Sequence, residues 1–232
     1  MERNVESDVI VLNSKKWGSL HKRVTMISKE LGVFDAIVYG AQKGKLSSVC
    51  ESFTHGHAYL YFQSVRKEYS VTDMAIETPF EFLRNDLTRL YRAHAMAEIV
   101  IKMHGGDSLR LFDLLETSLA FLNESSFDSL QVLIQFMWRS ISIIGLEPDL
   151  DNCPICGKRY EEAEVLSFQP SMQTMCCHSC SPDMPEYSNL YLRAGMRRYF
   201  RHTTLLSTIE AVKVELHENA KQRIIYYLID YM

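Results

Sequence analysis

Short apolar runs rich in β-branched and aromatic residues follow one another along the first third of the chain, separated by Gly, Ser and Lys. They lie at residues 9–12, 24–28, 33–39, 57–65 and 69–76. Runs of this length and spacing are typical of strands in a small sandwich or barrel. Five such strands are what an oligonucleotide-binding (OB) barrel requires. Other five-stranded barrels fit the spacing equally well.

The period of the apolar pattern changes after Pro79, from alternation to the spacing of helices. Apolar stripes recur at residues 83–101, 111–122 and 130–144, and further helices are expected from about residue 188 and at 218–232. Asp107 or Ser108 can cap the second helix by accepting a backbone N–H bond. Gly145 and Pro148 end the third. We therefore expect an α+β protein, with an OB-type barrel at residues 1–79 and an all-α domain at 80–232.

Composition is that of an ordinary soluble globular protein, with 47% hydrophobic and 23% charged residues. Glycine (10) and proline (6) are too few for long flexible linkers. The N-terminus is polar, and the longest apolar runs fall far short of the roughly 20 residues that a membrane span needs. We therefore expect no membrane association and a cytoplasmic protein, in whose reducing surroundings its six cysteines seldom form disulfides.

Charge is unevenly distributed along a chain whose net charge is −4. Residues 11–67 hold nine Lys and Arg against three acidic residues, whereas residues 81–152 hold six against eleven. A basic segment within an acidic chain indicates a localised anion-binding face. A solvated surface with chance clustering explains the same pattern about as well.

Five of the six cysteines lie between residues 153 and 180, and four of them form two C-x-x-C pairs. Cys153 and Cys156 are followed, twenty residues later, by Cys177 and Cys180. Two such turns supply the four soft ligands of a tetrahedral Zn²⁺. Gly157 is free to adopt the positive φ that such a turn often needs. The spacing predicts one structural Zn²⁺ in an insertion at about residues 150–185.

Cys176 leaves the ligand set open, because it could compete with its neighbours for the metal. Cys177 and Cys180 are preferred since only that pair repeats the C-x-x-C spacing. The alternative is a set of buried or redox-active thiols. A catalytic zinc is disfavoured, because four thiolates leave no open position for water.

Motifs of the common enzyme classes are missing. The sequence has no G-x-G-x-x-G, no phosphate loop, no H-E-x-x-H and no G-x-S-x-G. We therefore expect a protein that is not an enzyme. A metal-dependent hydrolase that uses His57 or Asp149 stays open as an alternative.

Residues 145–157 (GLEPDLDNCPICG) resemble the RecO recombination mediators of bacteria, in which a helix ends and runs directly into C-x-x-C-G. Residues 168–170 (FQP) resemble the lead into the second cysteine pair. The N-terminal part is similar at residues 17–18, 24–25, 32 and 38–41, followed by Lys43, Lys45, Ser47 and Phe53. The glycine pair usual before the second cysteine pair is replaced by Gln173 and Thr174.

The resemblance implies an N-terminal OB barrel, a helical domain and a zinc-binding insertion. It also implies a DNA repair protein that binds single- and double-stranded DNA, anneals complementary strands and pairs with RecR. Such proteins contact the single-strand-binding protein SSB and help to load RecA onto SSB-coated strands. The expected location is the cytoplasm, with the nucleoid.

Single-strand binding needs cations for the phosphates and flat rings for the bases. The expected DNA-binding residues are Lys15, Lys16, Trp17, Lys22, Arg23, Lys43, Lys45, Arg66 and Lys67. Tyr39, Tyr59, Tyr61 and Phe62 are further rings, of which we expect Tyr59 and Phe62 to lie in the barrel core.

A second basic surface is expected after the cysteines, at Arg193, Arg197, Arg198 and Arg201. It would bind DNA or an acidic peptide such as the C-terminal tail of SSB, and simple solvent exposure is an equal alternative. The competing interpretation of the whole chain is a zinc-ribbon and OB-barrel protein that binds RNA.

Overall fold

The computed structural model of the 232-residue chain divides into two compact units, residues 1–129 and 130–232. The structure describes residues 4–41, 46–103 and 106–161, and the shorter stretches 164, 166–169, 174–180, 191–192, 221–222, 224–225 and 228–229. Each unit is described by itself. Among the helices in these ranges, none has the length and apolar character that crossing a bilayer requires.

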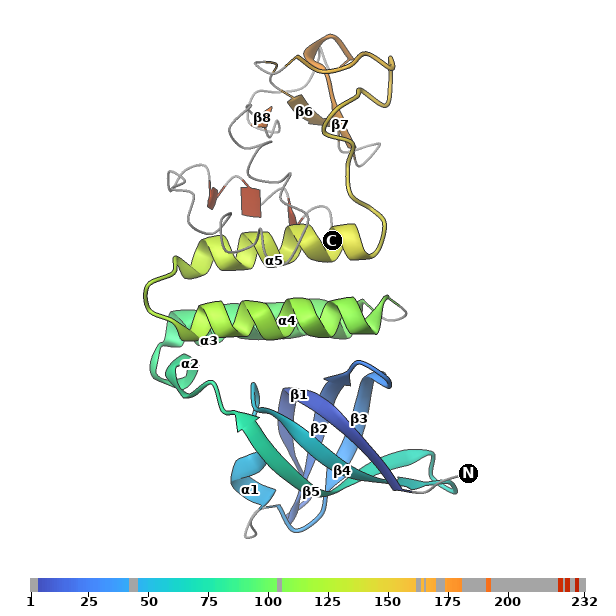
Figure 1. The fold of residues 1–232 in the computed structure, drawn as a ribbon, viewed down its shortest axis with the longest axis vertical. Coiled ribbons are helices and arrows are strands. Elements are labelled where there is room, and N and C mark those ends of the chain that lie inside the picture. Colours follow the sequence, from blue (N-terminus) through green and yellow to red (C-terminus); the bar gives the residue numbers. More distant parts are fainter. Residues whose placement is uncertain are drawn as a thin grey trace. The chain divides into compact units, whose positions relative to one another are not determined.

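The first unit begins with a closed five-stranded barrel of strand order β1-β2-β3-β5-β4. Its elements are β1 (Asn4–Trp17), β2 (His21–Ser28), β3 (Gly32–Val38), the short helix α1 (Leu46–Val49), β4 (His55–Gln63) and β5 (Glu68–Thr78). All pairs are antiparallel except β3 and β5, which pair in parallel over two positions. This order, with a helix between the third and fourth strands, is the predicted OB-type barrel (Figure 1).

Strand β1 is much longer than its apolar run of residues 9–12 predicts. Its first half, as far as Ile10, pairs with β4, and its second half, from Val9 to Trp17, pairs with β2. The register shifts between Val11 and Asn13, which is a β-bulge. A bulge of this kind bends a strand, and here the bent strand closes the barrel by joining both neighbours.

Alternating residues of the strands fill the barrel interior. The buried cluster is made of Val9, Val11, Val24, Met26, Ala36, Val38, Ala41, Val49, Cys50, Ala58, Leu60, Val71 and Met74. Ile10 and Ile27 are opposite each other on the outer side and are also fully buried. They are covered because helices of the same unit contact β1 and β2 there.

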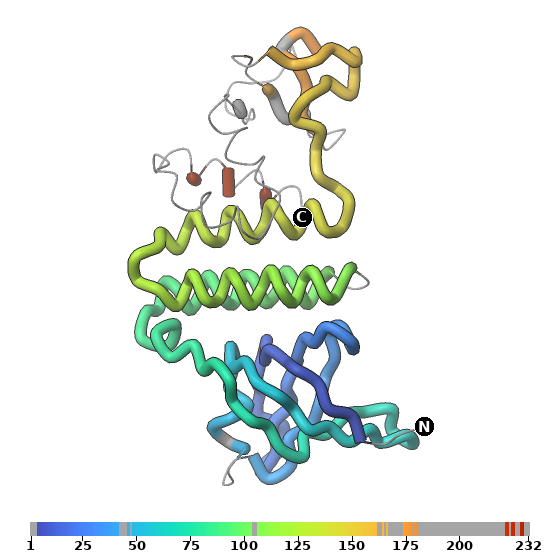
Figure 2. The backbone as a smooth tube through the Cα atoms, in the orientation of Figure 1, coloured from blue at the N-terminus to red at the C-terminus, as the bar shows by residue number. Residues whose placement is uncertain are grey.

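Those helices are α2 (Glu81–Asn85), α3 (Leu87–Lys102) and α4 (Ser108–Asn123), which the chain enters directly from β5 (Figure 2). Helix α3 contacts β1, and α4 contacts β2 and β3. Lys29 ties α4 to the barrel through an ion pair with Asp113 at 2.7 Å. The Asp107 side chain caps α4 by accepting from the backbone N–H of Arg110, as the sequence predicted.

A buried arginine fixes the end of α4. The side chain of Arg89, only 9% exposed, donates to four backbone carbonyls, those of Leu122, Glu124, Ser125 and Phe127, at 2.8–3.3 Å. Its Nε pairs with Asp86 at 3.3 Å. A guanidinium has five N–H donors, and here five acceptors surround it.

The second unit contains α5 (Ser129–Ile143) except for its first residue, and a small three-stranded sheet of β6 (Leu166–Gln169), β7 (Thr174–Cys176) and β8 (Tyr191–Leu192). Trp138 is buried in α5. Helix α5 ends at Ile143, and Gly145 follows with a φ of 75°, which allows Leu146 N–H to donate to the carbonyl of Ile141.

The prediction of a helix from about residue 188 is wrong at its start. Tyr191 and Leu192 instead form β8 and pair with Ser167 and Leu166 of β6. The described residues within 218–232 are helical, and the rest of that expected helix lies outside the described residues. The domain boundary at residues 79/80 stays a prediction. The compact units divide later, so that α2, α3 and α4 belong with the barrel.

Candidate nucleic-acid interface and metal centre

The candidate interface lies on the outer side of the barrel, where β1, β2 and β3 run side by side. Lys15 lies opposite Arg23, and Trp17 lies opposite His21. Val24, the next residue of β2, belongs to the barrel interior. Because side chains alternate between the faces of a strand, the other four point outward. The pairing of β1 with β2 thus gathers cations and rings on one face.

Three aromatic rings form the first part of this face, which we call the ring cluster: Trp17, His21 and Tyr39. The His21 ring lies 6.2 Å from Trp17 and 5.1 Å from Tyr39, centroid to centroid. Trp17 and Tyr39 are 41% and 46% exposed. The Gly40 N–H donates to His21 Nδ1 at 3.1 Å, which holds the imidazole between the other two rings. Exposed rings of this kind are platforms on which bases stack.

Two exposed cations, Lys15 and Arg23, continue the face along the strands. Arg23 Nε pairs with Asp35 Oδ2 at 3.3 Å, with both side chains about half exposed. An ion pair this exposed is weak, so Arg23 remains able to exchange its carboxylate partner for a phosphate. Lys15 and Arg23 are therefore the described barrel cations best placed to hold a strand beside the ring cluster.

Lys22 and Lys16 lie on the other side of the same strands, since they are opposite each other one position along. The Lys22 Nζ pairs with Glu51 at 2.5 Å, and its side chain is only 13% exposed. Lys16 is exposed at the barrel rim. The structure thus separates Lys22 from Lys15 and Arg23, although all three were expected in one DNA-binding set.

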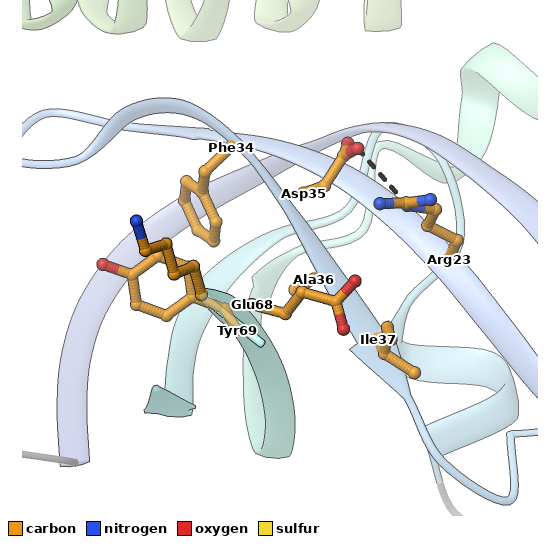
Figure 3. A pocket seen from close by; sticks show the side chains of 8 residues that line it. Arg23, Phe34, Asp35, Ala36, Ile37, Glu68 and Tyr69 are labelled. Atoms are coloured by element: carbon orange, nitrogen blue, oxygen red, sulfur yellow. Dashed lines mark ion pairs between the residues drawn. The ribbon is translucent and has the colours of Figure 1, made fainter. Parts of the chain in front are cut away.

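The β4–β5 turn adds Arg66 and Lys67, both exposed. Lys67 has a φ of 53°, a conformation that costs a residue with a side chain about 1 kcal/mol or more. Lys67 reaches a pocket of about 200 Å³ at the β3–β5 junction, which Arg23 also lines. Figure 3 shows the Arg23–Asp35 ion pair on one side of this pocket and the rings of Phe34 and Tyr69 on the other.

The interface therefore spans β2 and β3, the end of β1 that leads into the β1–β2 loop, and the β4–β5 turn. These are the elements on which OB barrels bind oligonucleotides. The chemistry fits that use, because cations can hold the phosphates while exposed rings contact the bases. His21, Phe34 and Tyr69 were not among the expected site residues.

Other expected site residues are not part of this face in the part of the chain that the structure describes. Lys43 and Lys45, and the second basic surface of Arg193, Arg197, Arg198 and Arg201, lie outside the described residues. Tyr59 is 40% exposed and is not part of the barrel core, so that expectation is wrong. Phe62 is half-buried and packs against Tyr69, with ring centroids 5.0 Å apart.

A separate candidate site in the second unit is made of four cysteines. The sulfur atoms of Cys153, Cys156, Cys177 and Cys180 all lie within 4.8 Å of one another. The two turns that carry them are closed by backbone bonds, from Gly157 N–H to the carbonyl of Cys153 and from Cys180 N–H to the carbonyl of Cys177. Gly157 has a φ of 72°, the positive value that the sequence suggested for this turn.

The cluster fits a tetrahedral metal ion. The sulfurs of Cys156 and Cys177 are 3.7 Å apart, close to the separation of about 3.8 Å that four metal–sulfur bonds of about 2.3 Å produce. Burial raises the pKa of Cys153, but backbone N–H bonds from Cys177, Cys156 and Ile155 outweigh it and lower the pKa to about 6. This sulfur is therefore biased toward the thiolate, the form that binds metals, whereas the hydrogen bond with Cys177 raises the pKa of Cys180.

Cys176 is buried in β7, where it pairs with Ser167 of β6. It is not one of the four cysteines whose sulfurs come together. The four that do are the four that the C-x-x-C spacing favours. Which metal they bind, and whether they bind one, stays a proposal.

The hydrolase alternative finds no support in the described part of the chain, where the cysteine cluster is the only group of three or more potential ligands whose ligand atoms all lie within 4.8 Å of one another. His57 Nδ1 lies 2.6 Å from Asp8 and its Nε2 lies 3.7 Å from Glu6, so its nitrogens face two different carboxylates. The Asp8 hydrogen bond raises the pKa of His57. Asp149 accepts from the backbone N–H groups of Asp151 and Asn152, as a loop cap does.

Comparisons with known proteins identify the same family in the N-terminal and the C-terminal parts of the chain. A family model described as "Recombination protein O N terminal" matches residues 1–80, and one described as "Recombination protein O C terminal" matches residues 84–229. The DNA repair protein RecO of Syntrophobacter fumaroxidans is 26% identical over 234 residues, which cover 99% of this chain and 92% of the relative. That of Bacillus pumilus is 27% identical over 236 residues, which cover 98% and 89%. These matches do not favour the RNA-binding alternative.

Proposed function

The chain belongs to the RecO family of DNA repair proteins, and from this premise we propose that it is a recombination mediator. It binds single- and double-stranded DNA, anneals complementary strands, and with RecR helps to load RecA onto SSB-coated DNA. It works in the cytoplasm, with the nucleoid. It makes and breaks no covalent bond, and its effect on annealing comes from holding strands.

The observation that carries this proposal is the outer barrel face, where Lys15 and Arg23 lie beside the ring cluster. Cations that neutralise phosphates release bound counterions, which supplies affinity without regard to sequence. Rings that stack with bases favour single strands, because only unpaired bases expose their faces. Two complementary strands held on such a face repel each other less and meet more often.

We assign the metal of the four-cysteine cluster as zinc, held by Cys153, Cys156, Cys177 and Cys180. Four thiolates fill a tetrahedral shell and leave no position for water, so the ion has a structural role. Because Cys153 and Cys156 lie on one turn and Cys177 and Cys180 on the other, the metal would tie the two turns together.

The partners that we propose are RecR, the acidic C-terminal tail of SSB and, indirectly, RecA. Arg193, Arg197, Arg198 and Arg201 stay our candidates for the acidic tail or for a second DNA surface. Arginine suits either role, because its planar fork binds carboxylate and phosphate oxygens in pairs.

Strand annealing tests the proposal. Complementary oligonucleotides are coated with SSB, and their pairing is followed by fluorescence energy transfer with and without the protein. We expect acceleration that declines as salt rises, since the phosphate contacts are screened. Lys15→Glu combined with Arg23→Glu should remove most of this acceleration.

The control is Arg110→Glu with Lys102→Glu, which reverses the same number of charges on exposed residues of α4 and α3. It should anneal like the unaltered protein. Acceleration that survives the Lys15 and Arg23 changes would place annealing on another surface. No acceleration by the unaltered protein would contradict the mediator function itself.

A further inference from the structure

The pocket at the β3–β5 junction contains more than phosphate binding requires. Arg23 and Lys67 line it, but so do two carboxylates, Asp35 and Glu68. Carboxylates repel phosphates, so a site that only held the backbone of a nucleic acid would be weakened by them. Their presence in the same pocket as two cations therefore needs a different explanation.

Only one of these carboxylates already has a hydrogen bond and an ion pair with described residues. Asp35 accepts from Thr25 Oγ1 at 2.7 Å and pairs with Arg23. The carboxylate of Glu68 has no hydrogen bond or ion pair with any residue that the structure describes. In Figure 3 it lies between the Tyr69 ring and Ile37. It is thus an acceptor that is available to a ligand.

Aromatic rings supply the apolar side of the pocket. Phe34 and Tyr69 meet edge to face, with centroids 5.3 Å apart, and both are half-buried because they also pack against the interior cluster of the barrel. The volume of about 200 Å³ is below the range of about 300–1,000 Å³ typical of sites for whole small molecules. A flat ring system fits this combination of size, aromatic wall and single acceptor better than an entire nucleotide does.

We propose that this pocket receives one unstacked base of the bound single strand and selects bases that carry an exocyclic amino group. The base lies against Tyr69 and donates its amino hydrogen to Glu68, while Arg23 and Lys67 hold the adjacent phosphates. This inference rests on the proposed function, since it adds a base preference to the same interface.

A comparison of cytosine with uracil distinguishes a hydrogen bond to Glu68 from stacking alone. Cytosine presents an amino donor at C4, which a Glu carboxylate accepts. Uracil presents a carbonyl oxygen there, which a carboxylate repels. The two bases have nearly the same shape, so that stacking and phosphate contacts are matched. A difference in affinity between them then reports the contact with Glu68.

The experiment measures binding of the full chain to fluorescein-labelled dC and dU homopolymers about twelve nucleotides long, within the site size of an OB barrel. Fluorescence anisotropy is recorded at pH 8. We expect the dC strand to bind about three- to tenfold more tightly, the effect of a hydrogen bond to a charged acceptor that is half-buried. Glu68→Gln should bring the ratio close to one, because an amide both donates and accepts.

The matched control is Glu98→Gln, which removes an exposed carboxylate from α3 and should leave the dC preference unchanged. Equal binding of the two strands by the unaltered protein overturns the pocket proposal alone, because the strands are still bound. A preference that survives Glu68→Gln also overturns it. Absence of binding to either strand overturns the proposed function together with the pocket.

Discussion

Replacing Cys177 with serine is expected to abolish metal binding, whereas replacing its neighbour Cys176 is expected to preserve it. The sulfur of Cys177 lies 3.7 Å from that of Cys156 and belongs to the group of four, and Cys176 does not. Structural zinc sites of this type contribute about 10–16 kcal/mol of apparent binding free energy. A variant that lacks one of the four thiolates should therefore retain almost no bound metal.

The metal content of each variant is measured by native mass spectrometry and by elemental analysis, on protein purified under reducing conditions. One zinc ion per chain is expected for the unaltered protein and for Cys176→Ser. Cys176→Ser that loses the metal while Cys177→Ser retains it would show that the ligand set is wrong. An unaltered protein without metal would refute the zinc assignment.

Replacing Arg89 with methionine should be the most damaging single change to the first unit. All five N–H donors of the guanidinium have acceptors, and four of these are the carbonyls of Leu122, Glu124, Ser125 and Phe127. Methionine fills a similar volume but leaves these carbonyls and the Asp86 carboxylate without their donor. We expect the free energy of unfolding to fall by about 3 kcal/mol.

Urea unfolding followed by far-UV circular dichroism measures this loss. Arg89→Lys should be intermediate, because an ammonium keeps the charge but has three donors instead of five. Arg110→Met removes an exposed arginine from α4 and should change stability by less than about 0.5 kcal/mol. Equal stability of Arg89→Met and Arg110→Met would mean that the arginine does not hold the end of α4.

The alternation of apolar residues was enough to predict the barrel but not the extent of its strands. The second half of β1 has no apolar alternation, because residues 13–16 are polar. It is a strand because it pairs with β2. Tyr59 is an aromatic residue within an apolar run, yet it faces outward because it lies between Ala58 and Leu60, which both face the barrel interior. The short strand β8 gave no signal of its own, since its pairing with β6 is what defines it.

The four-cysteine cluster could be predicted from its spacing, because two C-x-x-C turns each bring two sulfurs toward one ion. The nucleic-acid face could be predicted only in part. Lys15, Lys22 and Arg23 look alike in the sequence, and only the strand register shows that Lys22 turns toward Glu51. The β3–β5 pocket depends on a parallel pairing of residues more than thirty positions apart, which no local pattern reveals.

The salt dependence of single-strand binding tests the central claim, that the outer barrel face holds DNA, most directly. Each phosphate contact on a single strand contributes about −0.7 to the slope of log affinity against log salt. The account predicts that Lys15→Ala with Arg23→Ala makes the slope shallower by about 1.4 and that Arg110→Ala leaves it unchanged. A slope that is the same in all three proteins would contradict the assignment of this face.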